Sequence, residues 1–309
     1  SALAASDFGE YDDNNVWQPK EYSGTYGTNG FRLTFADNSS NSALGNDSSG
    51  NDNDFTVNNL TAESPTSLPG VAFDGSGDYL QLANSNDFDL GSNDFTWECF
   101  AYVEDLNAGT PQWFFSVFSS SSGDNAWGLR LESNGTLYAY LSSDGGESPT
   151  TIGPTLANSG MSDKKWHHLA VVRSGSGSNN ITVYVDGTSK ATGSFTGSVK
   201  DTSLPLQIGR QGSSSSPQYI DGKISNLRII NGTALYTANF SAPATPLTNV
   251  TNTKLLCCQS SSSTTAATVG GTITANGNVF AGTFSDSTSA DDSLIDTPTN
   301  YTASSGNNG

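Results

Sequence analysis

Seven glutamates are spread along the chain, and none has the spacing that paired-carboxylate chemistry on a β-strand requires. A retaining glycosidase needs two carboxyl groups about 5 Å apart. Residues two apart share one face of a strand, so the pattern sought is Glu-x-Asp with a further Glu two or three residues later. No glutamate begins such a run, and Glu98 is followed by Cys99 and Phe100 where an aspartate is needed. The sequence therefore argues against a glycosidase of this type, and we expect no enzymatic role.

The only two histidines, His167 and His168, are adjacent in the chain. Neighbouring residues of a strand point to opposite faces, so the two imidazoles cannot bind one metal ion together. A Ser/His/Asp triad or a zinc site would have to use one of them alone. We interpret both as structural residues of a strand.

Aspartates gather in two glycine-containing segments that could hold a cation. Asp47 and Asp54 lie in one polar loop, and Asp74 and Asp78 flank a Gly-Ser-Gly turn. Ca²⁺ binds six to eight hard oxygens, which carboxylates and carbonyls of such turns can present. We expect any Ca²⁺ where these two segments meet. The alternative is that the aspartates serve only turn conformation.

Aromatic residues beside loops could stack on the apolar faces of sugars. Trp113, Trp127 and Tyr219 are placed in this way, whereas Trp97 and Trp166 fit strand cores. We predict the first three as carbohydrate-binding residues, with core packing as the alternative for each.

The charge balance bounds the partners of the chain. It carries 30 acidic and 12 basic side chains, for a net charge of −18. Such a field repels nucleic-acid phosphates and anionic membrane surfaces. No apolar run approaches the roughly 18 residues of a membrane span. We therefore expect no nucleic-acid partner and no membrane insertion.

Three cysteines are too few for a disulfide framework. Cys99 lies inside a strand pattern, and Cys257 and Cys258 are adjacent. We expect buried free thiols, and a Cys99–Cys257 disulfide remains open.

The elements that must position these residues are strands. Short alternating segments bounded by Gly, Asn, Asp and Ser recur from Val71 onward, which is typical of an antiparallel sandwich with under about a tenth of its residues in helices. Residues 31–35 alternate as well and are predicted as the first strand. The residues predicted to be buried are Trp97, Cys99, Trp166 or its neighbour Leu169, Val183, Val185 and Ile208.

Six segments in order resemble concanavalin A-like/laminin-G-like jelly-roll domains. They are residues 31–54, Phe73-Asp74-Gly75-Ser76-Gly77-Asp78-Tyr79-Leu80, Asp94–Glu98, Trp166–Arg173, Val183–Gly187 and Ile220–Ile229. The resemblance implies an all-β antiparallel sandwich at residues 30–259. An irregular N-terminal arm at 1–29 and a Ser/Thr/Gly-rich extension or linker at 260–309, with one hairpin near 270–284, would flank it.

The flanks around Trp17–Tyr22 and Asp292–Tyr301 are similar to connectors in marine and cyanobacterial phage virion proteins. This resemblance implies a non-enzymatic module of a phage tail, fibre or capsid that binds host-surface carbohydrate, located in the virion or extracellularly. A secreted or cell-surface bacterial adhesin is the alternative, and a hydrolase with an unfamiliar site is a third hypothesis.

Both flanks contain aromatic and apolar residues but no pattern able to close a core. Ordering a segment costs about 1–2 kcal/mol per residue, so an ordered arm must bury its aromatics against something else. We predict that at least one arm contacts another chain, either a different virion protein or a copy of this one.

Overall fold

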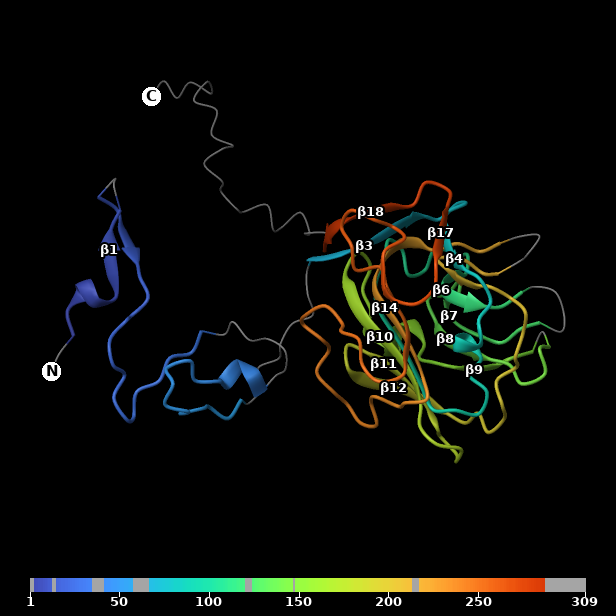
Figure 1. Ribbon diagram of the computed structural model, residues 1–309, viewed down its shortest axis with the longest axis horizontal. Coiled ribbons are helices and arrows are strands. Elements are labelled where there is room, and N and C mark those ends of the chain that lie inside the picture. Colours follow the sequence, from blue (N-terminus) through green and yellow to red (C-terminus); the bar gives the residue numbers. More distant parts are fainter. Residues whose placement is uncertain are drawn as a thin grey trace, which may run out of the picture. The chain divides into compact units, whose positions relative to one another are not determined.

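The computed structural model describes residues 3–12, 15–34, 42–57, 67–119, 124–146, 148–212 and 217–286. The chain divides into two compact units, residues 1–62 and residues 63–309, which we call the N-terminal unit and the sandwich (Figure 1). The sequence pattern predicts a domain boundary at residue 30, whereas the two compact units divide at Ala62 and Glu63.

The described residues of the N-terminal unit form four short elements: η1 (Ala5–Asp7), β1 (Gly9–Tyr11), β2 (Trp17–Pro19) and η2 (Ser42–Gly45). Strands β1 and β2 pair with each other in antiparallel register. The strand predicted at residues 31–35 is not present at residues 31–34, and Phe35 lies outside the described residues. The Arg32 N–H donates instead to the Asp47 carboxylate at 2.8 Å, so a side chain takes the place of a partner strand.

The sandwich consists of two antiparallel sheets (Figure 1). Within the described residues, the nine-stranded sheet has the path β12 (Thr188–Gly193), β11 (Ile181–Val185), β10 (Trp166–Arg173), β5 (Phe95–Val103), β14 (Asp221–Asn231), β15 (Thr253–Cys257) and β16 (Ala267–Val269), with β3 (Ser67–Asp74) pairing β14 and β18 (Phe280–Ser285) pairing β3. The seven-stranded sheet has the order β17 (Ile273–Asn276), β4 (Tyr79–Leu82), β13 (Leu206–Ile208), β6 (Gln112–Val117), β7 (Trp127–Leu131), β8 (Leu137–Leu141) and β9 (Thr150–Ile152). The prediction of an antiparallel sandwich is confirmed.

Helix is scarce, as predicted. In the described part of the sandwich it is limited to η3 (Asn86–Phe88) and α1 (Leu156–Ser159). Helix α1 is capped at its C-terminus by Gly160, whose φ of 78° is in the left-handed region that favours glycine.

Alternating side chains of the two sheets meet in one apolar core. The Trp97 ring of β5 stacks on the Phe95 ring at 4.5 Å and on the Trp127 ring of β7 at 4.8 Å, so aromatic rings join the sheets. Every residue predicted to be buried is at most 2% exposed: Trp97, Cys99, Trp166, Leu169, Val183, Val185 and Ile208. Trp166 is buried on the outer face of its sheet, beside Phe284 of β18.

The three cysteines are free thiols within the core, as expected. Burial raises the pKa of the Cys99 thiol, so the neutral thiol is the stable form. The Sγ atoms of Cys257 and Cys258 lie 3.7 Å apart without a bond between them.

The segment predicted as a C-terminal extension supplies three strands of the sandwich. The hairpin expected near residues 270–284 does not form, because β17 pairs with β4 of one sheet and β18 with β3 of the other. Asp78 holds the connection between them, since its Oδ1 accepts the Asn278 N–H at 2.7 Å. These pairings cover strand edges that would otherwise expose unpaired main-chain groups.

Candidate functional site

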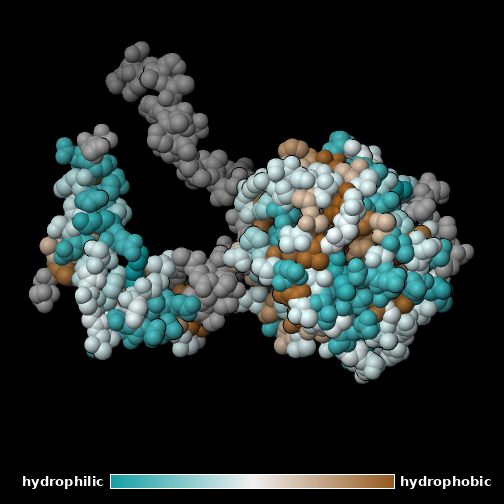
Figure 2. Space-filling model, viewed as in Figure 1, coloured by the Kyte–Doolittle hydropathy of each residue, from teal (hydrophilic) through white to brown (hydrophobic). Residues whose placement is uncertain are grey.

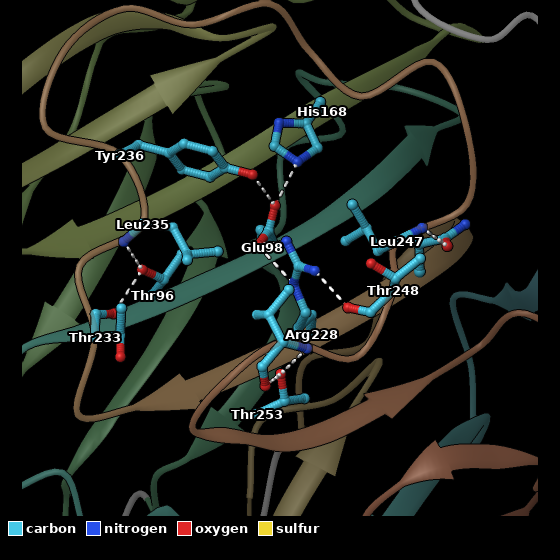
Figure 3. A network of polar contacts seen from close by, with 12 residues as sticks. Thr96, Glu98, His168, Arg228, Thr233, Leu235, Tyr236, Leu247, Thr248 and Thr253 are labelled. Atoms are coloured by element: carbon cyan, nitrogen blue, oxygen red, sulfur yellow. Dashed lines mark hydrogen bonds and ion pairs between the residues drawn. The ribbon is translucent and has the colours of Figure 1, made fainter. Parts of the chain in front are cut away.

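Glu98 lies on the outer face of the nine-stranded sheet, within a network of polar contacts (Figure 3). Arg228 donates to its Oε1 from Nε at 2.9 Å and from Nη2 at 2.7 Å. Tyr236 donates its hydroxyl to Oε2 at 2.8 Å, and His168 Nε2 lies 3.0 Å from the same oxygen. The third guanidinium nitrogen, Nη1, donates to the Thr248 carbonyl at 2.6 Å.

The network is closed by residues 232–250, which we call the strap. Thr96 fastens one part of it, because its hydroxyl donates to the Thr233 carbonyl at 3.0 Å and accepts the Leu235 N–H at 3.0 Å (Figure 3). The rings of Tyr236 and Phe240 stack at 3.6 Å over the same face of the sheet. The strap therefore covers the network and leaves Glu98 0% exposed.

Electrostatics keep this buried carboxyl group ionised. Burial by itself would raise the pKa of Glu98, but the hydrogen bond and charge of His168 and the charge of Arg228 outweigh it, and the pKa falls below its ordinary value. Both carboxylate oxygens are occupied and neither meets solvent, so this group holds the strap and has no access to a substrate.

The two histidines lie on opposite faces of β10, as their spacing predicts. His167 Nε2 accepts the Ser162 N–H at 2.9 Å, so the ring proton is on Nδ1, which lies 2.7 Å from Asp186 Oδ2. His168 is 0% exposed beside Glu98. Each ring has its own carboxylate partner, which agrees with structural roles for both.

Trp127 was predicted to bind carbohydrate, and this prediction is wrong. Its side chain is 0% exposed in the core, and its Nε1–H donates to the Phe88 carbonyl at 3.0 Å. A ring enclosed in this way offers no face to a sugar.

Trp113 was predicted for the same role and is also 0% exposed. It lies on the outer face of the seven-stranded sheet, where its ring fills the space above Gly128. A Cβ atom at that glycine would come within 2.8 Å of the indole. The guanidinium of Arg130 lies over the ring at 5.4 Å, and the Tyr140 ring lies 5.2 Å away. The prediction for Trp113 is corrected, because these neighbours cover its ring.

Tyr219 is the one predicted aromatic that remains partly exposed, and it belongs to a surface cluster. Arg210 forms an isolated β-bridge with Tyr219, and its guanidinium carbon lies 5.5 Å from the centroid of that ring. The same carbon lies 4.5 Å from the centroid of the Tyr79 ring, at the start of β4. All three side chains are half-buried. We call Tyr79, Arg210 and Tyr219 the tyrosine–arginine cluster.

Sequence reasoning did not identify Tyr79 and Arg210 as site residues. Tyr79 lies at the start of β4 and Arg210 follows β13, and neither has an unusual local sequence pattern. They meet because β4 pairs with β13, which ends two residues before Arg210. No local signal in the sequence predicts that long-range pairing.

The predicted metal ligands are divided between the two units. In the N-terminal unit, Asp47 accepts the N–H groups of Arg32, Ser49 and Asn53. Although partial burial would raise its pKa, these hydrogen bonds and that of the Ser49 hydroxyl lower the pKa of Asp47 to about 2. Asp54 Oδ1 accepts the Asp47 N–H at 2.8 Å.

In the sandwich, Asp74 is exposed and accepts the Ser76 N–H at 2.9 Å, whereas Asp78 is only 2% exposed. Within the described residues, no three His, Cys, Asp or Glu side chains are arranged to hold a metal ion.

Within the same ranges, no helix is long and apolar enough to span a membrane.

The sequence of the sandwich matches that of a known protein family. The sequence profile Laminin_G_3, described as the concanavalin A-like lectin/glucanases superfamily, matches residues 74–238. No curated protein in the comparison is similar to the chain in sequence.

Similar solved structures include a candidate carbohydrate-binding protein from Bacteroides ovatus, with 13% identity, a TM-score of 0.49 and coverage of 76% of this chain and 67% of that one. Domains LG4-5 of the mouse laminin α1 chain are 19% identical, with a TM-score of 0.38 and coverage of 64% of this chain and 54% of that one. The CBM40 of the Ruminococcus gnavus IT-sialidase, bound to α2,3-sialyllactose, is 15% identical, with a TM-score of 0.44 and coverage of 57% of this chain and 95% of that one. With TM-scores below 0.5, none of these similarities assigns a ligand or an activity to this chain.

Proposed function

Because the chain belongs to the concanavalin A-like lectin/glucanases superfamily, we propose that the sandwich is a non-catalytic module that binds carbohydrate at the tyrosine–arginine cluster. Superfamily membership alone does not specify a ligand or a site. The proposal therefore depends on the chemistry of the surface itself.

The observation that supports it is the pair of half-buried tyrosine rings beside one guanidinium group. Tyr79 and Tyr219 combine an apolar ring with a polar hydroxyl group, which suits a ligand that has both C–H faces and hydroxyl groups. The polar network at Glu98 offers no comparable surface, because hydrogen bonds occupy both oxygens of that carboxylate and the protein encloses it.

Affinity electrophoresis with a panel of neutral and acidic polysaccharides tests the proposal. We expect at least one polymer to retard the chain, and Tyr219→Ala to weaken that binding about three- to tenfold. Phe280→Ala is the matched control, because Phe280 is an aromatic residue of the same unit that is 63% exposed and lies outside the cluster. Retardation by no polymer, or equal losses in the two variants, would contradict the proposal.

We also propose that the module is part of a phage virion surface, in a tail, fibre or capsid, with a secreted or cell-surface bacterial adhesin as the alternative. Aromatic pairs in the N-terminal unit support an assembly role. The Phe31 and Phe55 rings lie 4.6 Å apart and are 49% and 45% exposed, and Trp17 is 43% exposed. Another virion protein or a second copy of the chain would cover these rings.

Light scattering on the full chain tests this assembly proposal. Oligomers that dissociate in the Phe31→Ser/Phe55→Ser double variant would support self-association, and a monomer that co-sediments with purified virion parts would support a different partner. A monomer that binds neither itself nor virion parts would contradict it.

Calcium binding remains a proposal as well, at Asp47 and Asp54 within the N-terminal unit and at Asp74 and Asp78 within the sandwich. Asp54 and Asp74 are exposed, and the net charge of −18 favours a bound cation. Thermal melting with Ca²⁺ and with a chelator tests it. We expect a higher midpoint with Ca²⁺, and an unchanged midpoint would mean that these aspartates serve only their turns.

A further inference from the structure

We infer that the tyrosine–arginine cluster is selective for acidic sugars, and that the Arg210 guanidinium binds the carboxylate of a uronic-acid residue. This inference rests on the proposed carbohydrate-binding function and adds the chemical class of the ligand. It depends on how Arg210 differs from the other arginines of the chain.

The chain has five arginines, and four of them donate to a protein oxygen. Their acceptors are Glu21 for Arg32, Glu132 for Arg130, the carbonyls of Gly91 and Gly197 for Arg173, and Glu98 with the Thr248 carbonyl for Arg228. Arg210 differs in having no such acceptor at any of its three nitrogens among the described residues. Its Nε is buried without a hydrogen-bond partner, as are the Nε atoms of Arg130 and Arg173. Its guanidinium group lies over the rings of Tyr79 and Tyr219 instead.

This arrangement orients the donors of Arg210 without occupying them. The rings of Tyr79 and Tyr219 lie against the guanidinium at 4.5 and 5.5 Å, which restricts the side chain. A planar guanidinium binds a carboxylate through two parallel N–H···O bonds, and restricting it beforehand reduces the entropy lost on binding. A sugar carboxylate could meet the edge of the guanidinium while the sugar ring contacts an adjacent tyrosine.

The net charge limits which anions fit. With −18 charges on the chain, a polyanion is repelled at long range, although screening acts over about 8 Å at physiological salt. Binding must then come from short-range contacts at this site rather than from charge density. We therefore expect selectivity for a carboxylate that Arg210 can bind in bidentate fashion, and not for polyanions in general.

The test compares two matched polymer pairs at 0.15 M NaCl, a concentration chosen for physiological screening. Polygalacturonate is compared with its methyl ester, which keeps the sugar backbone and removes the charge. Dextran sulfate is compared with dextran. We expect polygalacturonate to bind at least about tenfold more tightly than its ester, and dextran sulfate to bind no better than dextran.

Variants of Arg210 assign that preference. We expect Arg210→Gln to remove the tenfold preference and leave ester binding within about twofold, and Arg210→Lys to restore only part of it. Lys254→Gln is the charge-matched control, because it removes one positive charge from a surface ion pair with Asp87. Unchanged melting midpoints for the Arg210 variants would show that the cluster still folds.

Several outcomes would overturn the inference. Equal binding of polygalacturonate and its ester by the wild type would refute carboxylate selectivity while leaving carbohydrate binding intact. Strong, Arg210-dependent binding of dextran sulfate would mean that charge alone is recognised. Binding to none of these polymers nor to any polymer of the wider panel would refute both the inference and the proposed function.

Discussion

Two arginines on the sandwich have opposite environments. Arg228 on β14 donates to Glu98 and to the Thr248 carbonyl beneath the strap, and its side chain is only 6% exposed. Arg210 is half-buried, contacts two tyrosine rings, and has no oxygen acceptor among the described residues. The first is enclosed by protein, whereas the second keeps donors available.

The difference distinguishes structural from binding use of the same side chain. A buried charge is tolerated when its partners satisfy it, and removing one partner leaves the other uncompensated. A half-exposed charge with free donors adds little to folding and can instead meet a ligand. Hydrophilic areas predominate on the face of the molecule that Figure 2 displays, with smaller hydrophobic areas between them, so hydropathy alone does not single out a site.

The largest expected effect is on the enclosed pair. Arg228→Met leaves the Glu98 carboxylate buried without its guanidinium partner, and we expect the free energy of unfolding to fall by about 3–5 kcal/mol. Denaturant unfolding measures this change. A loss below about 1 kcal/mol would mean that the pair does not stabilise the strap.

Acid should act on the same pair. The pKa of Glu98 is lower in the folded chain than its ordinary value of 4.5, so its stabilising contribution is complete above that value and is lost as the pH falls through the folded pKa. We expect unfolding free energies measured against pH to fall in this acid range for the wild type. The fall should be smaller for Arg228→Met, and an identical pH slope in both would contradict the assignment.

A smaller effect is expected at the strap. Tyr236→Phe removes one donor to Glu98 and keeps the ring stacked on Phe240. We expect a loss of about 1.5–3 kcal/mol, the usual range for a hydrogen bond to a charged group. Faster proteolysis within residues 232–250 would locate that loss in the strap.

The smallest expected effect is at the open arginine. Arg210→Gln loses only the contacts with two tyrosine rings at a partly exposed position, so unfolding should change by about 1 kcal/mol or less. Denaturant unfolding beside Arg228→Met makes the comparison direct. A loss as large as that of Arg228→Met would make Arg210 a structural residue.

Local sequence patterns were sufficient for most of the sandwich. Apolar residues at every second position of Phe95–Val103 predict β5 at its observed bounds, and the Trp166–Arg173 segment coincides with β10. Both strands are buried on both faces, which the local pattern does not show. Residue spacing alone also predicts that Glu98 has no paired carboxylate and that His167 and His168 lie on opposite faces of their strand. Family resemblance then gave the order of the strands.

Only the tertiary structure decided which strands pair and what covers each outer face. Residues 31–34 alternate like a strand but pair with no strand in the described part of the chain, whereas Phe280–Ser285 pairs with β3 more than two hundred residues away. Trp113 is hidden because distant residues pack over it, and Arg210 meets Tyr79 through the pairing of β4 with β13. Periodicity reports which face of a segment is apolar, but pairing and burial depend on long-range contacts, which a local pattern does not encode.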